Sequence, residues 1–197
     1  IEGHPFGLMA NDSRYLGGAI DSDASDKAAR FMQLCDAFDL PIISLVDAPG
    51  FMVGPEHEKT GLVRHTSRMF LAGAAVQVPI MAIVLRKAYG LGAMAMVGGG
   101  FHDSLFIVSW PSGEFGAMGL EGAVKLGYKK ELEAAEGLKE KQALYRRLVA
   151  SAYEKGKAIK AAPFLEIDEV IDPADTRKWI MKGLAICQQR RGDRGSR

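Results

Sequence analysis

Short runs of apolar residues alternate with longer amphipathic segments through the first half of the chain. Such runs are typical of buried strands, and a period of about 3.6 residues is typical of helices with one buried face. The strands predicted in this way are 5–10, 42–46, 80–85 and 105–108, with a further short strand at 16–20. The predicted helices are 21–38, 61–78 and a short one at 94–97. Strands that alternate with helices predict a parallel sheet with right-handed crossovers.

The last third of the chain follows the helical period almost throughout. A helix is expected from about Leu120, and residues 131–189 are almost all helical in pattern. One apolar stripe there consists of Leu138, Tyr145, Leu148, Val149 and Ala152. Residues 190–197 are polar and hold four arginines, which predicts a disordered tail. We therefore expect one domain over residues 1–189, followed by that tail.

Composition and charge narrow the classes of partner. Hydrophobic residues make up 48% of the chain, and the formal net charge is only +1. Nucleic acid is not expected as a partner, because phosphate binding calls for a basic excess. No apolar run reaches the roughly 18 residues of a membrane span, and no signal-peptide pattern opens the chain. Cys35 and Cys187 fall on apolar helix faces, which favours buried thiols in a reducing compartment.

The most specific feature lies between Arg86 and Met96, where a strand gives way to glycines and then to a helix. Amides at a helix N-terminus lack acceptors within the helix, and glycines let a ligand oxygen approach them. Two such amides, around Leu91 and Gly92, would form an oxyanion hole, with Arg86 beside it as a permanent cation. The same glycines are equally compatible with tight packing of a strand against a helix.

A dinucleotide loop is a second interpretation, because residues 90–95 fit the pattern G-x-G-x-x-A. No acidic residue ends a following strand about 20 residues later, as a ribose contact requires. Residues 86–89 also separate the predicted strand from the first glycine, whereas the dinucleotide motif needs the two to be adjacent. Both differences argue against nicotinamide binding.

Two other segments sit where strands end. Asp47 precedes Pro49 and Gly50 at the end of a buried strand. It could act as an acid–base group, because ligands collect at such strand ends, but we favour a role as a cap of the turn. Met118 and Gly119 lie in a glycine-rich strand exit and form either one wall of a flat apolar slot or a packed turn. No metal site is expected, because the histidines lack the spacing of a zinc motif. A serine-hydrolase elbow and a Walker A lysine are absent as well.

Three ordered blocks, 46–51, 86–96 and 110–124, resemble the C-terminal domain of the carboxyltransferase (β) subunit of biotin-dependent acyl-CoA carboxylases. Segments 7–12 and 167–177 resemble the two ends of that domain, so the resemblance covers nearly the whole chain. In one respect the chain departs from many propionyl- and acetyl-type members, which read Tyr-Gly-Gly-Ala. Residues 89–93 read Tyr-Gly-Leu-Gly-Ala instead, closer to the spacing of methylcrotonyl-type members.

The resemblance implies a fold and a reaction. The fold is an α/β crotonase-like spiral of ββα units with a helical C-terminal region. The family transfers a carboxyl group from carboxybiotin on a carrier protein to the α (or vinylogous γ) carbon of an acyl-CoA. This chain would hold the biotin half, with the Leu91 and Gly92 amides facing the ureido oxygen and Arg86 placing the carboxyl group. Residues implied to line the biotin site are Tyr89, Gly90, Ala93, Met94, Gly50, Phe51, Met118 and Gly119, with Met94 and Met96 as an apolar wall.

The resemblance also implies partners: biotin carboxylase, the biotin carrier protein, acyl-CoA, an N-terminal domain of similar fold and further copies of the chain. The chain begins at Ile1 rather than Met, so we expect a piece of a longer or processed polypeptide that is inactive alone. We expect it in a bacterial cytoplasm or a mitochondrial matrix. Alternatives are a subunit of a biotin-dependent acyl-CoA decarboxylase, which runs the transfer backward, and a non-catalytic assembly domain of the same fold.

Overall fold

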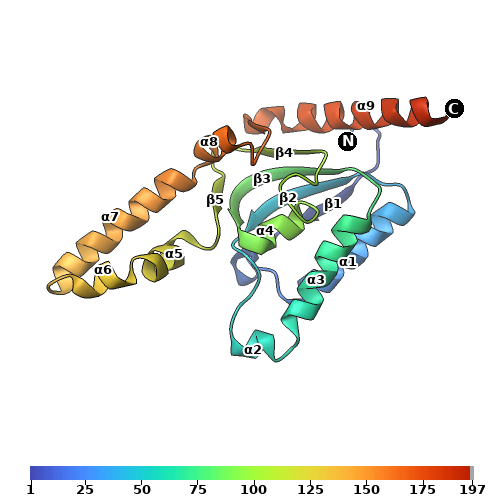
Figure 1. The fold of residues 1–197 in the computed structure, drawn as a ribbon. Helices are drawn as coiled ribbons and strands as arrows, with labels where there is room; N and C mark the ends of the chain where they lie inside the picture. Colours follow the sequence, from blue (N-terminus) through green and yellow to red (C-terminus); the bar gives the residue numbers. More distant parts are fainter. Residues whose placement is uncertain (196–197) are drawn as a thin grey trace.

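A parallel sheet forms the centre of the computed structural model, which describes the backbone of residues 1–195 and the side chains of residues 1–187 (Figure 1). Its strand order is β1-β2-β3-β4-β6, and β5 pairs with β3 away from that path. The strands are β1 Gly7–Ala10, β2 Ile42–Ala48, β3 Ile80–Tyr89, β4 Phe106–Ser109, β5 Glu114–Gly116 and β6 Glu169–Val170. The predicted α/β architecture with a parallel sheet is confirmed.

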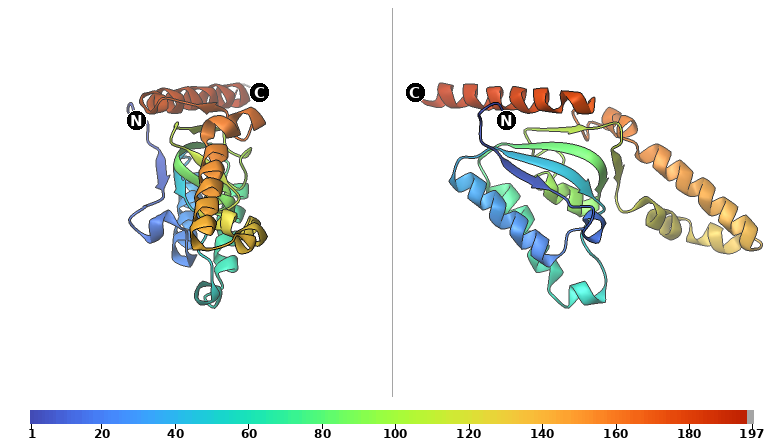
Figure 2. Two further views of the ribbon diagram at one scale, coloured as in Figure 1. Left: turned by 90° about the vertical axis from the view of Figure 1, so that its left-hand side faces the viewer. Right: turned by 180° about the vertical axis from the view of Figure 1, so that it is seen from behind.

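Helices cover both faces of this sheet (Figures 1 and 2). The neighbouring helices α1 (Ser22–Ala37) and α3 (Leu62–Ala75) lie on one side, with the short helix α4 (Gly90–Met96) against β2 and β3. Helix α9 (Thr176–Gly195) covers the other side. Side chains of β3 alternate accordingly: Ile80, Ala82 and Val84 join the core under α1 and α3, whereas Met81 and Ile83 join the core under α9.

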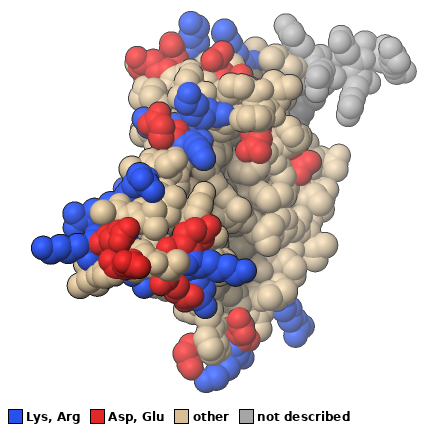
Figure 3. Space-filling model, turned by 60° about the vertical axis from the view of Figure 1, so that its left-hand side comes forward, with Lys and Arg blue, Asp and Glu red and all other residues tan. Residues whose placement is uncertain are grey.

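A helical arm of residues 120–156 extends away from the sheet (Figures 1 and 2). It consists of α5 (Leu120–Gly127), α6 (Lys129–Ala134) and α7 (Leu138–Gly156). The predicted apolar stripe of α7 is only partly buried, and Leu138 is 72% exposed, because α7 packs mainly against α5 rather than against the sheet. Basic and acidic side chains are intermixed on the face seen in Figure 3, in keeping with the small net charge.

Short elements complete the described chain: helices α2 (Pro55–Glu58) and α8 (Ala158–Ala161), and the 3₁₀ turns Leu16–Gly18, Ala162–Phe164 and Pro173–Asp175. None of the helices in the described residues is both long and apolar enough to cross a bilayer. Cys35 is fully buried as expected, whereas Cys187 is only half-buried. Helix α9 continues through Gly195. Of residues 190–197, which were expected to form a disordered tail, 196–197 lie outside the described residues.

The structure corrects three boundaries. The expected strand at 16–20 is a 3₁₀ turn, because Gly17 and Gly18 have φ of 63° and 92°, and only Ile20 forms an isolated bridge. The 131–189 segment contains the short strand β6, which completes the sheet beside β4. Strand β3 continues past residue 85 to Tyr89, and the helix starts at once with Gly90.

Strand β3 is long because it changes partners midway. Residues Met81 to Val84 pair with β4, whereas Lys87 to Tyr89 pair with β5. The register of β2 against β3 shifts at a bulge between Val46 and Ala48, next to the point where β3 changes partners. The predicted gap between the strand and the first glycine does not exist, so it no longer argues against a dinucleotide loop. The missing acidic residue still argues against such a loop.

Gly73 lets α3 approach the end of α4, and its replacement tests this packing. A Cβ at Gly73 would lie 2.2 Å from the Gly98 carbonyl oxygen, where only backbone surrounds it. We expect Gly73→Ala to lower the free energy of unfolding by roughly 3 kcal/mol, as overpacking does. Urea unfolding measures the change.

Gly127→Ala is the matched control, because a Cβ there meets nothing within 4 Å. It should leave stability unchanged or raise it by up to about 1 kcal/mol, given the helix propensity of alanine. Equal stability of the two variants would contradict the packing described.

Candidate functional site

The three sequence blocks meet where β2 and β3 end. A Cβ on Gly92 would lie 2.6 Å from the carbonyl carbon of Gly50 and 2.9 Å from the amide nitrogen of Phe51. One on Gly90 would lie 2.7 Å from the carbonyl oxygen of Ala117. The start of α4 thus packs by its backbone against the exit of β2 on one side and the exit of β5 on the other.

The turn from β3 into α4 is followed directly by the first backbone donors of the helix. Gly90 has φ of 56°, which allows an abrupt turn directly after Tyr89. The first amides of a helix precede its first i→i−4 bond. Within the described residues, the amides of Leu91 and Gly92 have no acceptor in a turn, a loop or a side chain. Leu91 is 61% exposed, whereas Gly92 beside it is buried against the exit of β2, so the two donors lie at the edge of a backbone contact.

Asp47 and Arg86 hold the ends of β2 and β3 together. The guanidinium donates from Nη2 to Oδ2 at 2.9 Å and from Nε to Oδ1 at 3.2 Å, and the Lys87 amide donates to Oδ1 at 3.1 Å. Burial acts to raise the pKa of Asp47, but these hydrogen bonds outweigh it and keep the pKa below its ordinary value. The favoured assignment of Asp47 as a cap of the Pro49–Gly50 turn is therefore wrong, because its carboxylate accepts hydrogen bonds from two residues of β3.

Tyr89 is anchored behind the turn. Its side chain is 3% exposed, and its hydroxyl donates to Oε2 of Glu114 on β5 at 2.7 Å. Burial, together with this bond, raises the pKa of Tyr89 well above its ordinary value. Sequence reasoning missed Glu114, because β5 has only three residues and no periodicity to reveal it.

The remaining predicted site residues are distributed around the same turn. Met118 is 42% exposed, and Gly119 is the N-cap of α5. Ala93 is fully buried and Met94 half-buried within α4. Met96 departs from expectation, because at 3% exposure it faces the cavity at the other end of α4 rather than a slot beside the glycines.

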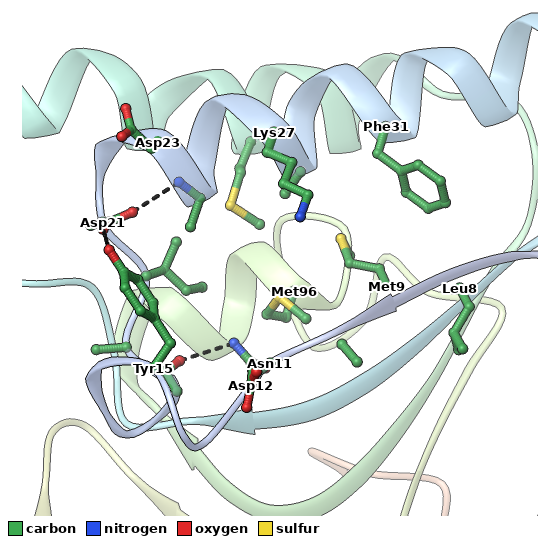
Figure 4. Close-up of a pocket in the computed structure, with 17 residues that line it drawn as sticks. Leu8, Met9, Asn11, Asp12, Tyr15, Asp21, Asp23, Lys27, Phe31 and Met96 are labelled. Atoms are coloured by element: carbon green, nitrogen blue, oxygen red, sulfur yellow. Dashed lines mark hydrogen bonds between the residues drawn. The ribbon is translucent and has the colours of Figure 1, made fainter.

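That cavity, of about 560 Å³, lies between β1 and α1 (Figure 4). Met9 and Met96 form its floor, and Lys27 and Phe31 reach over it from α1. Ile20 lines it and also forms a backbone bridge to Phe51, next to Gly50. Leu91 and Gly92 are not among the residues that line this cavity.

No group of three or more His, Cys, Asp or Glu residues that could hold a metal ion occurs in the described part of the chain. Nδ1 of His65 instead lies 2.8 Å from Oδ2 of Asp26, a half-buried pair between α3 and α1. His65 is therefore a hydrogen-bonded histidine between two helices rather than a residue that lines a cleft.

Replacing Asp47 by Asn tests its pairing with Arg86. At pH 7 we expect a loss of about 2 kcal/mol in the free energy of unfolding, typical of a hydrogen bond to a charged group. Because the pKa of Asp47 is depressed in the folded state, its contribution is present above the unfolded pKa and is lost as the pH falls through the folded value. The two proteins should therefore converge in stability below about pH 4.

Urea titrations from pH 3 to 7 measure this difference. Asp12→Asn is the control, because Asp12 pairs with Arg14 in full contact with solvent and should matter much less. A gap between Asp47→Asn and the parent protein that does not change with pH would contradict the assignment.

Comparison with known proteins gives the family. The model of the carboxyl transferase domain matches residues 1–196. The chain is 37% identical over 198 residues to the methylmalonyl-CoA carboxyltransferase 12S subunit of Propionibacterium freudenreichii, covering 98% of the chain. It is 36% identical over 195 residues to the propionyl-CoA carboxylase carboxyltransferase subunit of Haloferax mediterranei, covering 97% of it. The chain spans 36% of the length of each of these relatives.

Solved structures agree in fold. A single-chain, multi-domain long-chain acyl-CoA carboxylase superposes with a TM-score of 0.84 at 54% identity, over 92% of this chain and 18% of that one. The transcarboxylase 12S subunit superposes with a TM-score of 0.83 at 36% identity, over 93% of this chain and 35% of that one. The chain therefore belongs to the carboxyl transferase domain family, and its α/β fold is the crotonase-like fold of these carboxyltransferases.

Proposed function

We propose that this chain supplies the biotin-side half of an acyl-CoA carboxyltransferase site. The observation that carries the proposal is the pair of adjacent backbone amides at the start of α4, those of Leu91 and Gly92, which within the described residues have no acceptor in a turn, a loop or a side chain. Residues 86–96 hold no Ser, Cys or His that could serve as a nucleophile or its base. A site of this kind stabilises charge on an oxygen rather than forming a bond to the substrate.

The donor set fits a ureido oxygen. Bound carboxybiotin would supply the carboxyl group and leave negative charge on its ureido oxygen as that group departs. The Leu91 and Gly92 amides point from the positive end of α4 and donate hydrogen bonds to such an oxygen. Because this charge grows during the reaction, the donors favour the transition state over the ground state. Backbone packing of Gly92 on Gly50 holds them in place without reorganisation.

Walls for the ring come from apolar groups near the turn. Leu91 and Met118 are exposed at 61% and 42%, and they offer flat apolar surface beside the donors. The backbone of Gly50, Phe51 and Gly90 forms the base, together with Ala93, Met94 and Gly119. The side chain of Tyr89 is buried, so it would support this wall from inside the protein rather than contact the ring.

Arg86 supplies a fixed positive charge near the end of β3. Its hydrogen bonds to Asp47 raise its pKa further, so it stays protonated at any working pH. Nε and Nη2 contact Asp47, and the guanidinium retains Nη1 for another acceptor. We propose that this remaining edge orients the carboxyl group that is transferred.

The acyl-CoA half comes from a second body in this proposal. The donors do not line the cavity between β1 and α1, and Leu91 beside them is exposed, so another domain would have to cover them to exclude water. The chain spans only about a third of its curated relatives, and the similar transcarboxylase 12S structure is described as a hexamer. We therefore place the working site between this domain and an N-terminal domain of similar fold in an oligomer, served by a biotin carboxylase and a biotin carrier protein.

The direction of transfer has a competing candidate. The alpha subunit of the methylmalonyl-CoA decarboxylase of Veillonella parvula is 34% identical over 98% of the chain. A decarboxylase would use the same amides while the carboxyl group moves onto biotin. Carboxylation of acyl-CoA that depends on ATP and bicarbonate in the assembled enzyme would favour the carboxylase.

A Leu91→Pro substitution tests the amide role, because proline removes one donor and is tolerated in the first turn of a helix. In the assembled enzyme we expect carboxyl transfer to fall about 100-fold or more, as for loss of one oxyanion donor. Leu91→Ala keeps the amide and should stay within a few-fold of the parent. Steady-state rates and thermal melting are measured together, and a folded Leu91→Pro enzyme with full activity would rule out the amide role and favour a non-catalytic domain.

Identity to the relatives bears on the acyl group. The chain is 54% identical to the long-chain acyl-CoA carboxylase but only 36–37% identical to the propionyl- and methylmalonyl-CoA relatives. We therefore propose a long acyl chain as substrate. In the assembled enzyme, kcat/KM for palmitoyl-CoA should exceed that for propionyl-CoA by at least about 10-fold. A preference for propionyl-CoA would contradict this assignment.

A further inference from the structure

A buried tyrosine and a half-buried carboxylate join the two strands that flank the glycine turn. Tyr89 ends β3 and is the N-cap of α4, while Glu114 begins β5. The strands pair in parallel, with Lys87 opposite Glu114 and Tyr89 opposite Gly116. The hydroxyl of Tyr89 donates to Oε2 of Glu114 at 2.7 Å, and its ring packs beside Gly116. One hydrogen bond thus ties the residue before Gly90 to the strand that leads to Ala117.

Strand β5 is itself anchored from the side of the arm (Figure 1). Glu114 forms an antiparallel backbone bridge to Lys157, and the Ala158 amide donates to the Gly113 carbonyl at 2.9 Å. Gly156, at the end of α7, packs so closely that a Cβ would lie 2.8 Å from the Phe115 carbonyl oxygen. The position of β5 is therefore set by the base of the arm, and Glu114 transmits it to Tyr89.

We propose that Glu114 and Tyr89 are positioning residues for carboxyl transfer, which hold the start of α4 and its Leu91 and Gly92 amides at a fixed place. This inference rests on the proposed function of those amides. The Tyr89 side chain makes no capping bond to its own helix, so its one polar atom serves only the link to β5. Because the ring is 3% exposed, breaking that link would bury an unsatisfied hydroxyl, and the turn is correspondingly stiff.

The chain offers a matched control in a second tyrosine–glutamate pair. Tyr153 on α7 donates to Oε1 of Glu121 on α5, so this bond joins two helices of the arm and makes no link to β3 or α4. Its charges act on Tyr89, so Tyr153→Phe controls for electrostatic effects while leaving the link between β3 and β5 intact. It should leave the position of α4 and the rate of transfer as they are in the parent enzyme.

The test uses the assembled enzyme, with steady-state kinetics and amide hydrogen exchange measured on the same samples. Tyr89→Phe and Glu114→Ala should each lower kcat about 10-fold, because a small misplacement of donors is costly. KM for the acyl-CoA should not change, since its contacts lie elsewhere. Exchange in the peptide that spans α4 should become faster in both variants. Glu114→Gln keeps an acceptor for the hydroxyl and should restore both readouts.

The outcomes separate this inference from the proposed function. Unchanged exchange over α4 in both Tyr89→Phe and Glu114→Ala, or a Glu114→Gln enzyme as impaired as Glu114→Ala, would overturn the positioning role. Full kcat in both variants, with transfer abolished by Leu91→Pro, would overturn it too while the amide role stands. If Leu91→Pro has no effect on transfer, the proposed function fails, and exchange alone then decides whether the pair holds α4.

Discussion

The site depends on the contact between the backbone of Gly92 and the backbone of Gly50 and Phe51. This contact brings the start of α4 against the exit of β2, and it exists only because Gly92 has no Cβ. Gly90 does the same against Ala117, with a positive φ that turns the chain directly out of β3. Under the proposed function, donors held by such backbone contacts would need no rearrangement when charge develops on a bound oxygen.

Side chains around the turn serve to hold this backbone. Arg86 and Asp47 join the ends of β3 and β2, and Tyr89 and Glu114 join the ends of β3 and β5. Each pair bridges two strands whose exits contribute to the site. The arrangement suits a reaction in which the bound groups carry the chemistry and the protein supplies position and electrostatics.

Exposed apolar side chains lie beside the proposed donors. Leu91 and Met118 are exposed, and neither they nor Gly92 line the cavity between β1 and α1. Exposed apolar groups of this kind suit closure by another domain under the proposed function. This agrees with the length of the relatives, of which the chain spans about a third.

The sequence by itself determined the alternation of strands and helices, the parallel sheet and the family, because apolar periodicity and the glycine blocks are local signals. It also marked the glycine run before residue 94 as a turn from a strand into a short helix, although the structure starts that helix at Gly90. Only the tertiary structure decided that Asp47 pairs with Arg86 rather than capping its own turn, that β3 continues to Tyr89, and that Met96 faces another cavity. Glu114 likewise gained its role only from the fold. These outcomes depend on contacts between residues tens of positions apart, and no period or motif within one segment encodes them.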